Sequence, residues 1–351
     1  NLSVPNTHAY TRREPVGVCA QIIPWNFPML MAAWKIAPAM AAGCTVILKP
    51  AEQTSLTALL FGQMIMKAGF PAGVVNIITG FGETTGAPLA EHPQVDKVAF
   101  TGSTEVGKSI LRASAGNLKK VTLELGGKSP NVIFADADLE AATGGASMGI
   151  FFNHGQTCCA GSRVYVEKKA FDTVVGDMTN MANNIKLAPG MDASCEMGPM
   201  ISDEQLARVS GMVEEGKKAG ATAACGGEAL GGAGYFYKPT ILVDTTPKMN
   251  VVVDEIFGPV VTVIPFESTD DIIATANDSV YGLAAGIWTN DLSKAHKAAA
   301  ALKAGTIWVN CYNTFDNHMP FGGYKQSGVG REMGVEAIEN YLQTKSVCVQ
   351  L

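Results

Sequence analysis

The first third of the chain alternates short apolar runs with amphipathic stretches. The apolar runs are rich in residues that favour strands, and the amphipathic stretches repeat with the helical period. One such stretch, residues 54–69, can begin at a Thr54 or Ser55 cap and end at Gly69. Strands separated by helices predict a parallel sheet covered on both faces, which binds ligands at the carboxyl ends of its strands. The predicted strands are residues 16–23, 45–49, 74–80, 97–102 and 120–125.

A second series of the same kind follows Lys128. Residues 345–351 then predict one more strand, with no evident partner nearby in the sequence. Two successive series over 351 residues indicate the α/β fold class and more than one domain. The second series comprises predicted strands at residues 131–136, 163–167, 222–227, 239–244, 259–266, 283–289 and 306–311, and predicted helices near 171–186, 203–219 and 292–305.

Composition narrows the classes of function. The chain is 47% hydrophobic and 17% charged, with a net charge of −6 and no basic run interleaved with aromatic residues, which argues against a nucleic-acid partner. No apolar stretch is long enough and free enough of charge to predict a membrane span. The eight cysteines form no CxxC pair, which favours a reducing compartment such as the cytoplasm. The five histidines show no metal-ligand spacing.

Several polar residues directly follow predicted strands, where ligands would bind. Gly102 and Ser103 precede a helix whose free amides can face phosphate, although a simple N-cap explains Ser103 equally well. Lys49 and Glu52 can hydrogen-bond ribose hydroxyls, but such charges are more often a solvated loop pair. The glycines of GFGETTG, residues 80–86, differ from the dinucleotide-binding fingerprint, and a strand-to-helix turn explains them at least as well.

Three further stretches offer reactive groups. ELGGK places Glu124 after an apolar strand, where a desolvated carboxyl can act as a general base, though a structural glutamate is the more frequent meaning. PWNFP presents the amide of Asn26 rigidly, and turn formation alone also explains it. FFNHGQTCCAGSR holds two adjacent cysteines, and a buried cysteine is usually inert. If that stretch were helical, His154 would share a face with Cys158, as a thiol hydrolase needs, but no orienting Asp or Asn is evident.

In this order, the motifs PWNFP, LKPAEQT, FTGS, ELGGKSP, GQTCCAGSR, EIFGPV and PFGGYKQSG resemble the aldehyde dehydrogenase superfamily over essentially the whole chain. Three stretches are most similar to bacterial phenylacetaldehyde dehydrogenases, namely FFNHGQ, KQSGVGREMG and AGNLKKVTLELGGKSPN. The resemblance implies a Rossmann-like parallel-sheet cofactor domain, a second α/β catalytic domain and a β oligomerisation arm. It also implies that the family's long N-terminal helical segment is missing from the printed sequence. The implied boundaries are 1–15 for an arm strand, 16–127 for the NAD-binding domain, 128–330 for the catalytic domain and 331–351 for a C-terminal helix and oligomerisation strand.

The resemblance also implies the catalytic roles. Cys158, two residues after Gln156, is the expected nucleophile, and Cys159 is its neighbour in the pocket. Asn26 and the Cys158 amide would form the oxyanion hole, and Glu124 would be the general base. No metal is implied.

The implied cofactor is NAD. Lys49 and Glu52 would bind the adenosine ribose, Ser103 the pyrophosphate, and Glu255 and Phe257 the nicotinamide ribose. The charge of Glu52 would repel a 2′-phosphate, so we expect NAD to be preferred over NADP. The expected cofactor-binding residues are Ile23, Trp25, Lys49, Glu52, Gly82, Gly86, Phe100, Gly102, Ser103, Val106, Leu125, Gly126, Gln205, Arg208, Glu255 and Phe257.

The expected reaction is oxidation of a small apolar aldehyde, aryl or medium-chain, to the carboxylic acid through a cysteine thiohemiacetal and thioester. The alternatives are a cofactor-independent thiol esterase and an inactive, crystallin-like or truncated member. An exposed terminal strand needs a partner, so we expect a homodimer or homotetramer. The expected pocket residues are Phe27, Met31, Trp34, Thr157, Cys159, Asn313, Phe315 and Phe321.

Overall fold

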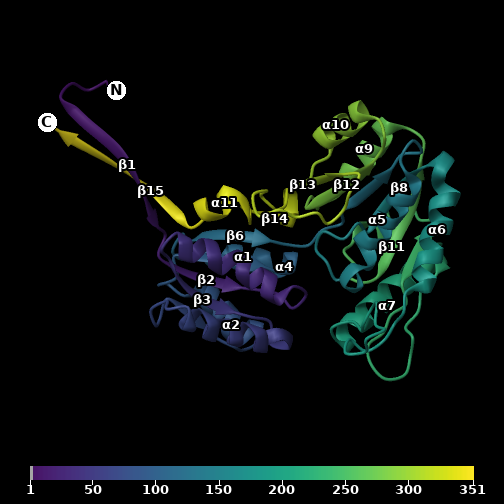
Figure 1. The fold of residues 1–351 in the computed structure, drawn as a ribbon, viewed down its shortest axis with the longest axis horizontal. Helices are drawn as coiled ribbons and strands as arrows, with labels where there is room; N and C mark the ends of the chain where they lie inside the picture. Colours follow the sequence, from purple (N-terminus) through teal and green to yellow (C-terminus); the bar gives the residue numbers. More distant parts are fainter. Residues whose placement is uncertain (1–2) are drawn as a thin grey trace. The chain divides into compact units, whose positions relative to one another are not determined.

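The structure is a computed structural model that describes residues 3–351. The chain divides into two compact units, each of which holds one of the two large sheets labelled in Figure 1. Unit 1 comprises the chain up to Glu124 together with Asp316–Gly322 and Val329–Leu351. Unit 2 comprises Leu125–Phe315 and Gly323–Gly328. The α/β fold class predicted from the sequence is confirmed.

The main sheet of unit 1 has six strands in the order β14-β6-β5-β2-β3-β4 (Figure 1). The pairs from β6 to β4 are all parallel, as predicted, with Ile22 opposite both Lys49 and Phe100. Because parallel strands end at the same edge, the residues that follow β2, β3, β5 and β6 gather there. The strands are β2 Val18–Ile22, β3 Thr45–Lys49, β4 Val75–Ile77, β5 Lys97–Thr101, β6 Lys120–Glu124 and β14 Gly328–Val329.

Helix α2 (Ser55–Lys67) begins where predicted, although its N-cap residue Thr54 makes no side-chain capping hydrogen bond. Pro28 occupies the first turn of α1, where its missing N–H is not needed, and Ser103 caps α4. The apolar faces of α1 and α2 join β2 and β3 in one buried cluster that includes Ile36, Val46 and Leu48. The helices are α1 Pro28–Ala41, α2 Ser55–Lys67, α3 Ala87–Glu91, α4 Thr104–Ser114 and α11 Gly334–Glu339, with a 3-10 turn at Glu52–Thr54 and a π turn at Gly82–Gly86.

Buried polar contacts connect the C-terminal part of unit 1 to its sheet and to α1. Lys35 Nζ and Glu332 Oε1 form an ion pair at 2.5 Å, with both side chains almost fully buried. Lys97 Nζ donates to Thr122 Oγ1 at 3.0 Å and lies 4.9 Å from the ring centre of Tyr341. Burial lowers the pKa of Lys97 to about 8. Removing one partner of a buried ion pair strongly destabilises the folded state, because the remaining buried charge lacks a partner.

The two terminal segments form a separate two-stranded ribbon. β1 (Thr7–Pro15) pairs antiparallel with β15 (Leu342–Gln350), from Thr7 opposite Gln350 to Pro15 opposite Leu342. β1 is therefore the partner that the sequence left unassigned for the last strand. Most residues of the ribbon are exposed, and both of its outer edges are unpaired among residues 3–351.

Unit 2 holds a seven-stranded sheet in the order β13-β12-β7-β8-β11-β10-β9, parallel except for β9 against β10. The strands are β7 Pro130–Ile133, β8 Arg163–Glu167, β9 Thr222–Cys225, β10 Thr240–Val243, β11 Val260–Phe266, β12 Ala284–Trp288 and β13 Thr306–Val309. The helices are α5 Leu139–Phe151, α6 Phe171–Asn184, α7 Asp203–Lys218, α8 Asn250–Val253, α9 Thr269–Asn277 and α10 Leu292–Ala301, with 3-10 turns at Phe152–Gly155, Lys168–Ala170 and Lys325–Ser327.

Helix α5 lacks a clear amphipathic pattern, and the sequence did not predict it. Seven of its 13 residues are buried, so it has no broad polar face to set the helical period. Helices α8 and α9 were also not predicted.

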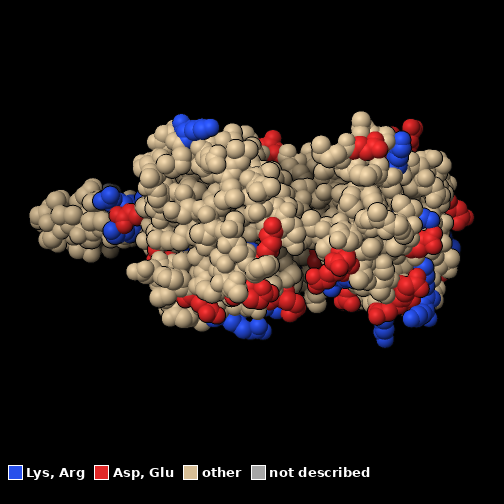
Figure 2. Space-filling model, turned by 90° about the horizontal axis from the view of Figure 1, so that it is seen from below, with Lys and Arg blue, Asp and Glu red and all other residues tan. Residues whose placement is uncertain are grey.

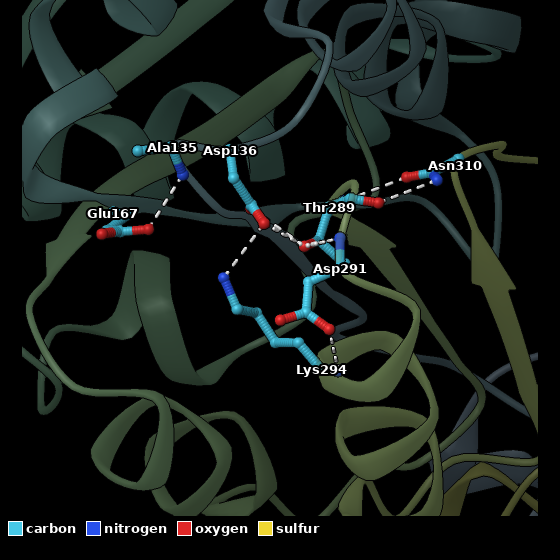
Figure 3. A network of polar contacts seen from close by, with 7 residues as sticks. All are labelled: Ala135, Asp136, Glu167, Thr289, Asp291, Lys294 and Asn310. Carbon is cyan, nitrogen blue, oxygen red and sulfur yellow. Dashed lines mark hydrogen bonds and ion pairs between the residues drawn. The ribbon is translucent and has the colours of Figure 1, made fainter.

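A polar network closes one end of the unit 2 sheet (Figure 3). Thr289, just after β12, donates its hydroxyl to Asp136 at 2.9 Å, and Lys294 of α10 contacts the same carboxylate at 3.2 Å. The Asn310 side chain bonds both the N–H and the C=O of Thr289, at 3.0 and 2.9 Å. The network thereby joins the segments after β7, β12 and β13 to α10.

The surface and composition of the described residues add four findings. On the face drawn in Figure 2, acidic and basic side chains are interspersed among large uncharged areas. No helix within residues 3–351 combines the length and apolarity that crossing a membrane requires. In the same residues, no three His, Cys, Asp or Glu side chains are grouped to hold a metal ion. All eight cysteine thiols are free.

Candidate active site

The carboxyl edge of the unit 1 sheet collects many of the predicted cofactor-binding residues. Ile23 and Trp25 follow β2, and the Ile23 N–H donates to Lys49 O at 3.1 Å. Lys49, the buried last residue of β3, donates Nζ to Glu52 Oε1 at 2.7 Å. Partial burial of Glu52 opposes ionisation, but the hydrogen bond from Lys49 prevails and lowers the pKa of Glu52. This edge therefore presents an ionised carboxylate on a partly buried ion pair.

The turn after β5 lies at the same edge as this pair, with β2 between β5 and β3 in the sheet order. The Ser103 side chain accepts a hydrogen bond from Val106 N at 3.3 Å, so the simple N-cap interpretation of Ser103 is realised. Val106 is half exposed in the first turn of α4. Gly102 packs against the Phe100 ring, because a Cβ added at Gly102 would lie 2.4 Å from Phe100 Cζ. Gly82 and Gly86 begin and end the π turn after β4.

The segment PWNFP connects β2 to α1. It places Asn26 directly before the residues that start the helix, between Pro24 and Pro28. Phe27 and Trp34 are partly buried against the unit 1 core, and Met31 belongs to it with 7% exposure. The ring of Trp34 meets the edge of Phe321 at a centroid distance of 5.7 Å.

Glu124 is the last residue of β6, and its side chain is buried. Its backbone carbonyl accepts from Gly102 N at 3.0 Å, which ties β6 to the β5 turn. Gly322 packs so closely that an added Cβ would lie 2.7 Å from Glu124 Oε1, and its φ of +157° also favours glycine. The sequence analysis did not single out Gly322, although PFGGYKQSG contains it.

In unit 2, Cys158 lies in the turn between the 3-10 segment Phe152–Gly155 and β8. Ala160 N donates to Thr157 O at 3.1 Å, which closes the turn around the two cysteines. Cys158 is half-buried, whereas Cys159 is 2% exposed. Hydrogen bonding with Cys159 and burial raise the pKa of the Cys158 thiol well above its ordinary value. The Cys158 thiol therefore loses its proton less readily in this structure than an ordinary cysteine thiol does.

Cys159 has a different environment. Its carbonyl accepts from the Tyr312 hydroxyl at 2.8 Å, and its Sγ donates to Asn313 Oδ1 at 3.5 Å. The Asn313 Nδ2 and the Thr157 Oγ1 are buried with no hydrogen-bond partner in the described part of the chain. Phe315 is 43% exposed and meets the edge of the Trp308 ring, 5.5 Å between centroids. No sequence signal had pointed to Tyr312.

His154 does not share a helix with Cys158. The 3-10 segment ends at Gly155, and Asn153 and His154 have positive φ, so the helical alternative is wrong. His154 Nε2 accepts from Gly198 N at 2.8 Å, and burial lowers the pKa of the imidazole. The ring nitrogen that would have to take a proton is thus occupied by a backbone amide, which disfavours a Cys–His hydrolase.

The remaining predicted residues of unit 2 meet around Glu255. Gln205 Nε2 donates to Phe257 O and Arg208 Nη2 to Glu255 O, each at 2.9 Å, so these two side chains of α7 hold the backbone of this loop. The carboxylate accepts from Gly127 N at 2.9 Å. Burial raises the pKa of Glu255 to about 7.

Leu125 and Gly126 precede Gly127 on the same strand-end segment. Leu125 is buried, and its N–H donates to Ser327 O at 2.9 Å. Unit 2 therefore combines, on three segments, the half-buried Cys158, a carboxyl group whose pKa is raised to about 7 and a glycine-rich backbone.

Comparison with known proteins identifies this set. The family model described as the aldehyde dehydrogenase family matches residues 1–347. The putative aldehyde dehydrogenase DhaS of Bacillus subtilis is 54% identical over 342 residues, 97% of this chain and 69% of that protein. An aldehyde dehydrogenase of Alternaria alternata is 51% identical over 99% of this chain and 70% of its own length. The NAD+ complex of an aldehyde dehydrogenase from Bacillus cereus superposes with a TM-score of 0.98 at 55% identity, over 99% of this chain and 71% of that chain. The chain belongs to the aldehyde dehydrogenase family.

Proposed function

We propose that this protein oxidises an apolar aldehyde, aryl or medium-chain, to the carboxylic acid with NAD as the oxidant. The observation that carries the proposal is the half-buried Cys158, held in its turn beside a fully buried Cys159, in a chain of the aldehyde dehydrogenase family. The direct test is the rise in absorbance at 340 nm when the protein is mixed with NAD and an aldehyde. An esterase would instead cleave an activated ester without NAD.

The chemistry of the donor groups fits NAD. Lys49 and Glu52 offer a donor and a carboxylate at the β3 end for ribose hydroxyls, and the first amides of α4 can face a pyrophosphate. In unit 2, Gly126 lacks a Cβ where Glu255 approaches, so backbone and carboxylate stay close together for a second ribose. When bound, NAD supplies the acceptor for the hydride of the substrate carbon.

The residues of the chain perform the other steps. Cys158 Sγ gives its proton to solvent and forms a bond to the aldehyde carbon, while the carbonyl electron pair moves to oxygen, where the Asn26 amide and the Cys158 N–H are the proposed donors. Loss of hydride from this carbon restores the carbonyl as a thioester. Glu124 then takes a proton from water, and the water oxygen attacks the thioester carbon. The C–S bond breaks, and Glu124 returns the proton to the departing thiolate, which releases the acid and the free thiol.

We expect phenylacetaldehyde to have a kcat/KM about tenfold to a hundredfold above that of acetaldehyde, because burying a phenyl ring against apolar side chains contributes roughly 1.5–3 kcal/mol. The proposed wall is aromatic, with Trp34 and Phe27 half-buried in unit 1 and Phe315 exposed in unit 2. Betaine aldehyde should also be poor, since Asp316 is the only acidic candidate near these residues in the sequence.

The measurement is initial rate of NADH formation over a panel of aldehydes at fixed NAD. Phe315→Ala should reduce the preference for phenylacetaldehyde, and Phe152→Ala, which removes another exposed phenyl ring of unit 2, is the matched control. Acetaldehyde as the best substrate would contradict the proposed wall.

We expect NAD to be preferred over NADP by roughly fivefold to several hundredfold in kcat/KM. Two unit charges about 4 Å apart repel by roughly 1 kcal/mol in water and about 4 kcal/mol at an effective dielectric constant of 20. The lowered pKa of Glu52 keeps its charge in place at neutral pH. Glu52→Gln should narrow the preference, whereas Glu91→Gln, which removes an exposed charge of the same unit, should not. Equal use of both cofactors by the wild type would refute the argument.

We further propose a homodimer or homotetramer in the cytoplasm. The ribbon supports assembly, because an isolated two-stranded ribbon is marginally stable and its edges can pair with another sheet. The eight free thiols support a reducing compartment.

A further inference from the structure

The two glycines of ELGGK meet different neighbours. At Gly126, an added Cβ would lie 2.2 Å from Glu255 Oε2, 2.8 Å from the carboxyl carbon and 2.9 Å from Oε1. At Gly127, it would lie 2.4 Å from the backbone carbonyl oxygen of Cys158 and 3.3 Å from Leu283 Cβ. Distances below 3.0 Å are essentially never seen for real Cβ atoms, so one partner of each contact would have to move.

Space, and not backbone conformation, makes glycine necessary here. Neither Gly126 nor Gly127 has a positive φ, so alanine could adopt both conformations without strain. The Gly127 N–H donates to Glu255 Oε1 at 2.9 Å, so this short segment contacts both Glu255 and Cys158. Glu255 is also among the charges that raise the pKa of Cys158, which agrees with their common neighbourhood.

We infer that Gly126 and Gly127 are separate positioning residues, Gly126 for the carboxylate of Glu255 and Gly127 for the main chain of Cys158. The inference rests on the proposed function, in which Glu255 binds the nicotinamide ribose and Cys158 is the nucleophile. Gly126 thus governs cofactor binding, and Gly127 governs the placement of the thiol and of the oxyanion-binding amide.

The two contacts differ in how they can relax. The carboxylate of Glu255 is at the end of a flexible side chain and can turn away from a methyl group at position 126. The carboxylate then no longer lies where it would bind the ribose. The Cys158 carbonyl belongs to the backbone, in a turn already closed by the Thr157–Ala160 hydrogen bond. A methyl group at position 127 therefore moves Cys158 itself. A misplacement near 1 Å at a reacting group costs on the order of 100-fold in rate.

The experiment compares Gly126→Ala and Gly127→Ala in the intact protein by two measurements that do not need turnover. The first is the Kd of NAD by titration calorimetry. The second is the rate of carboxamidomethylation of Cys158 by iodoacetamide, followed by mass spectrometry of the peptide that contains it. Gly144→Ala is the control, because its Cβ would meet nothing within 4 Å on α5 of the same unit.

We expect Gly126→Ala to raise the NAD Kd about tenfold with an alkylation rate within twofold of wild type. Gly127→Ala should change the alkylation rate at least fivefold and lower kcat by about tenfold to a hundredfold, with the NAD Kd within threefold of wild type. The double change Gly126→Ala with Glu255→Asp should regain part of the lost NAD affinity, because the shorter side chain relieves the contact. Leu283→Ala should not rescue Gly127→Ala, since the closest contact is with backbone.

Equal effects of the two substitutions on both measurements, or no effect on either, would overturn the inference. So would a Gly127→Ala protein that Leu283→Ala restores. If the wild type binds no NAD, the proposed function fails and the assignment of Gly126 fails with it, while alkylation still decides the assignment of Gly127. A variant that loses its folded state would show a lowered Tm. In that case the rescue by Glu255→Asp tests the assignment of Gly126. The assignment of Gly127 is then tested by kcat after partial refolding, with Gly144→Ala treated in parallel.

Discussion

Cys158→Ser is expected to abolish aldehyde oxidation, with kcat reduced by roughly 10⁴- to 10⁶-fold, as for removal of other covalent nucleophiles. A serine hydroxyl in the same half-buried turn ionises far less readily than a thiol, and the His154 ring, which accepts a backbone amide, is not available to activate it. NAD binding should persist, so calorimetry with NAD separates loss of chemistry from loss of folding. The measurement is NADH formation with phenylacetaldehyde.

Cys159→Ser is the matched control and should retain most of the activity. Cys159 is buried, and its contacts are a hydrogen bond from the Tyr312 hydroxyl to its carbonyl and one from its Sγ to Asn313. A serine hydroxyl can replace the second bond and leaves the first unchanged. An inactive Cys159→Ser enzyme with an active Cys158→Ser enzyme would reverse the assignment of the nucleophile.

Asn26→Ala is expected to lower kcat by roughly 10²- to 10³-fold, because an oxyanion donor acts only when negative charge develops on oxygen. The aldehyde KM should change much less, since the ground-state carbonyl needs this donor little. Steady-state kinetics with NAD saturating separate the two parameters. Asn76→Ala removes an amide of the same unit that bonds Gly73 O at 2.9 Å, far along the β3–β4 side of the sheet, and should leave kcat unchanged. A loss confined to KM would show that Asn26 only binds substrate.

The parallel sheet of unit 1 could be predicted from the sequence because each of its central strands is a continuous apolar run between helical stretches. Lys49, Gly102 and Glu124 lie at the ends of β3, β5 and β6, and the parallel topology places them at one edge of the sheet. The N-cap at Ser103 and the start of α2 at Ser55 are local signals that the structure confirms.

Other features depend on contacts between residues distant in the sequence, and no local pattern indicates them. The last strand was predicted from its sequence, but its pairing with β1 over the whole length of both strands was not, because the two segments lie at opposite ends of the sequence. The close approach at Gly126 and Gly127 involves side chains and backbone more than 30 residues away. The spacing of four between His154 and Cys158 leaves a shared helix face open in the sequence, and only the left-handed residues Asn153 and His154 in the structure exclude it.

The buried ion pair between Lys35 and Glu332 also constrains the order in which the parts of the chain can fold during synthesis. Lys35 and Glu332 lie 297 residues apart in the sequence, so a ribosome must synthesise all the residues between them before the ammonium group gains its counterion. Unit 2 contains no residue before Leu125 and none after Gly328, so a nascent chain can begin to fold that unit before the last residues of unit 1 have been synthesised. Unit 1 reaches its final form only when β15 has been synthesised and pairs with β1. Until then its buried lysine lacks its counterion and the incomplete unit is exposed to misassociation.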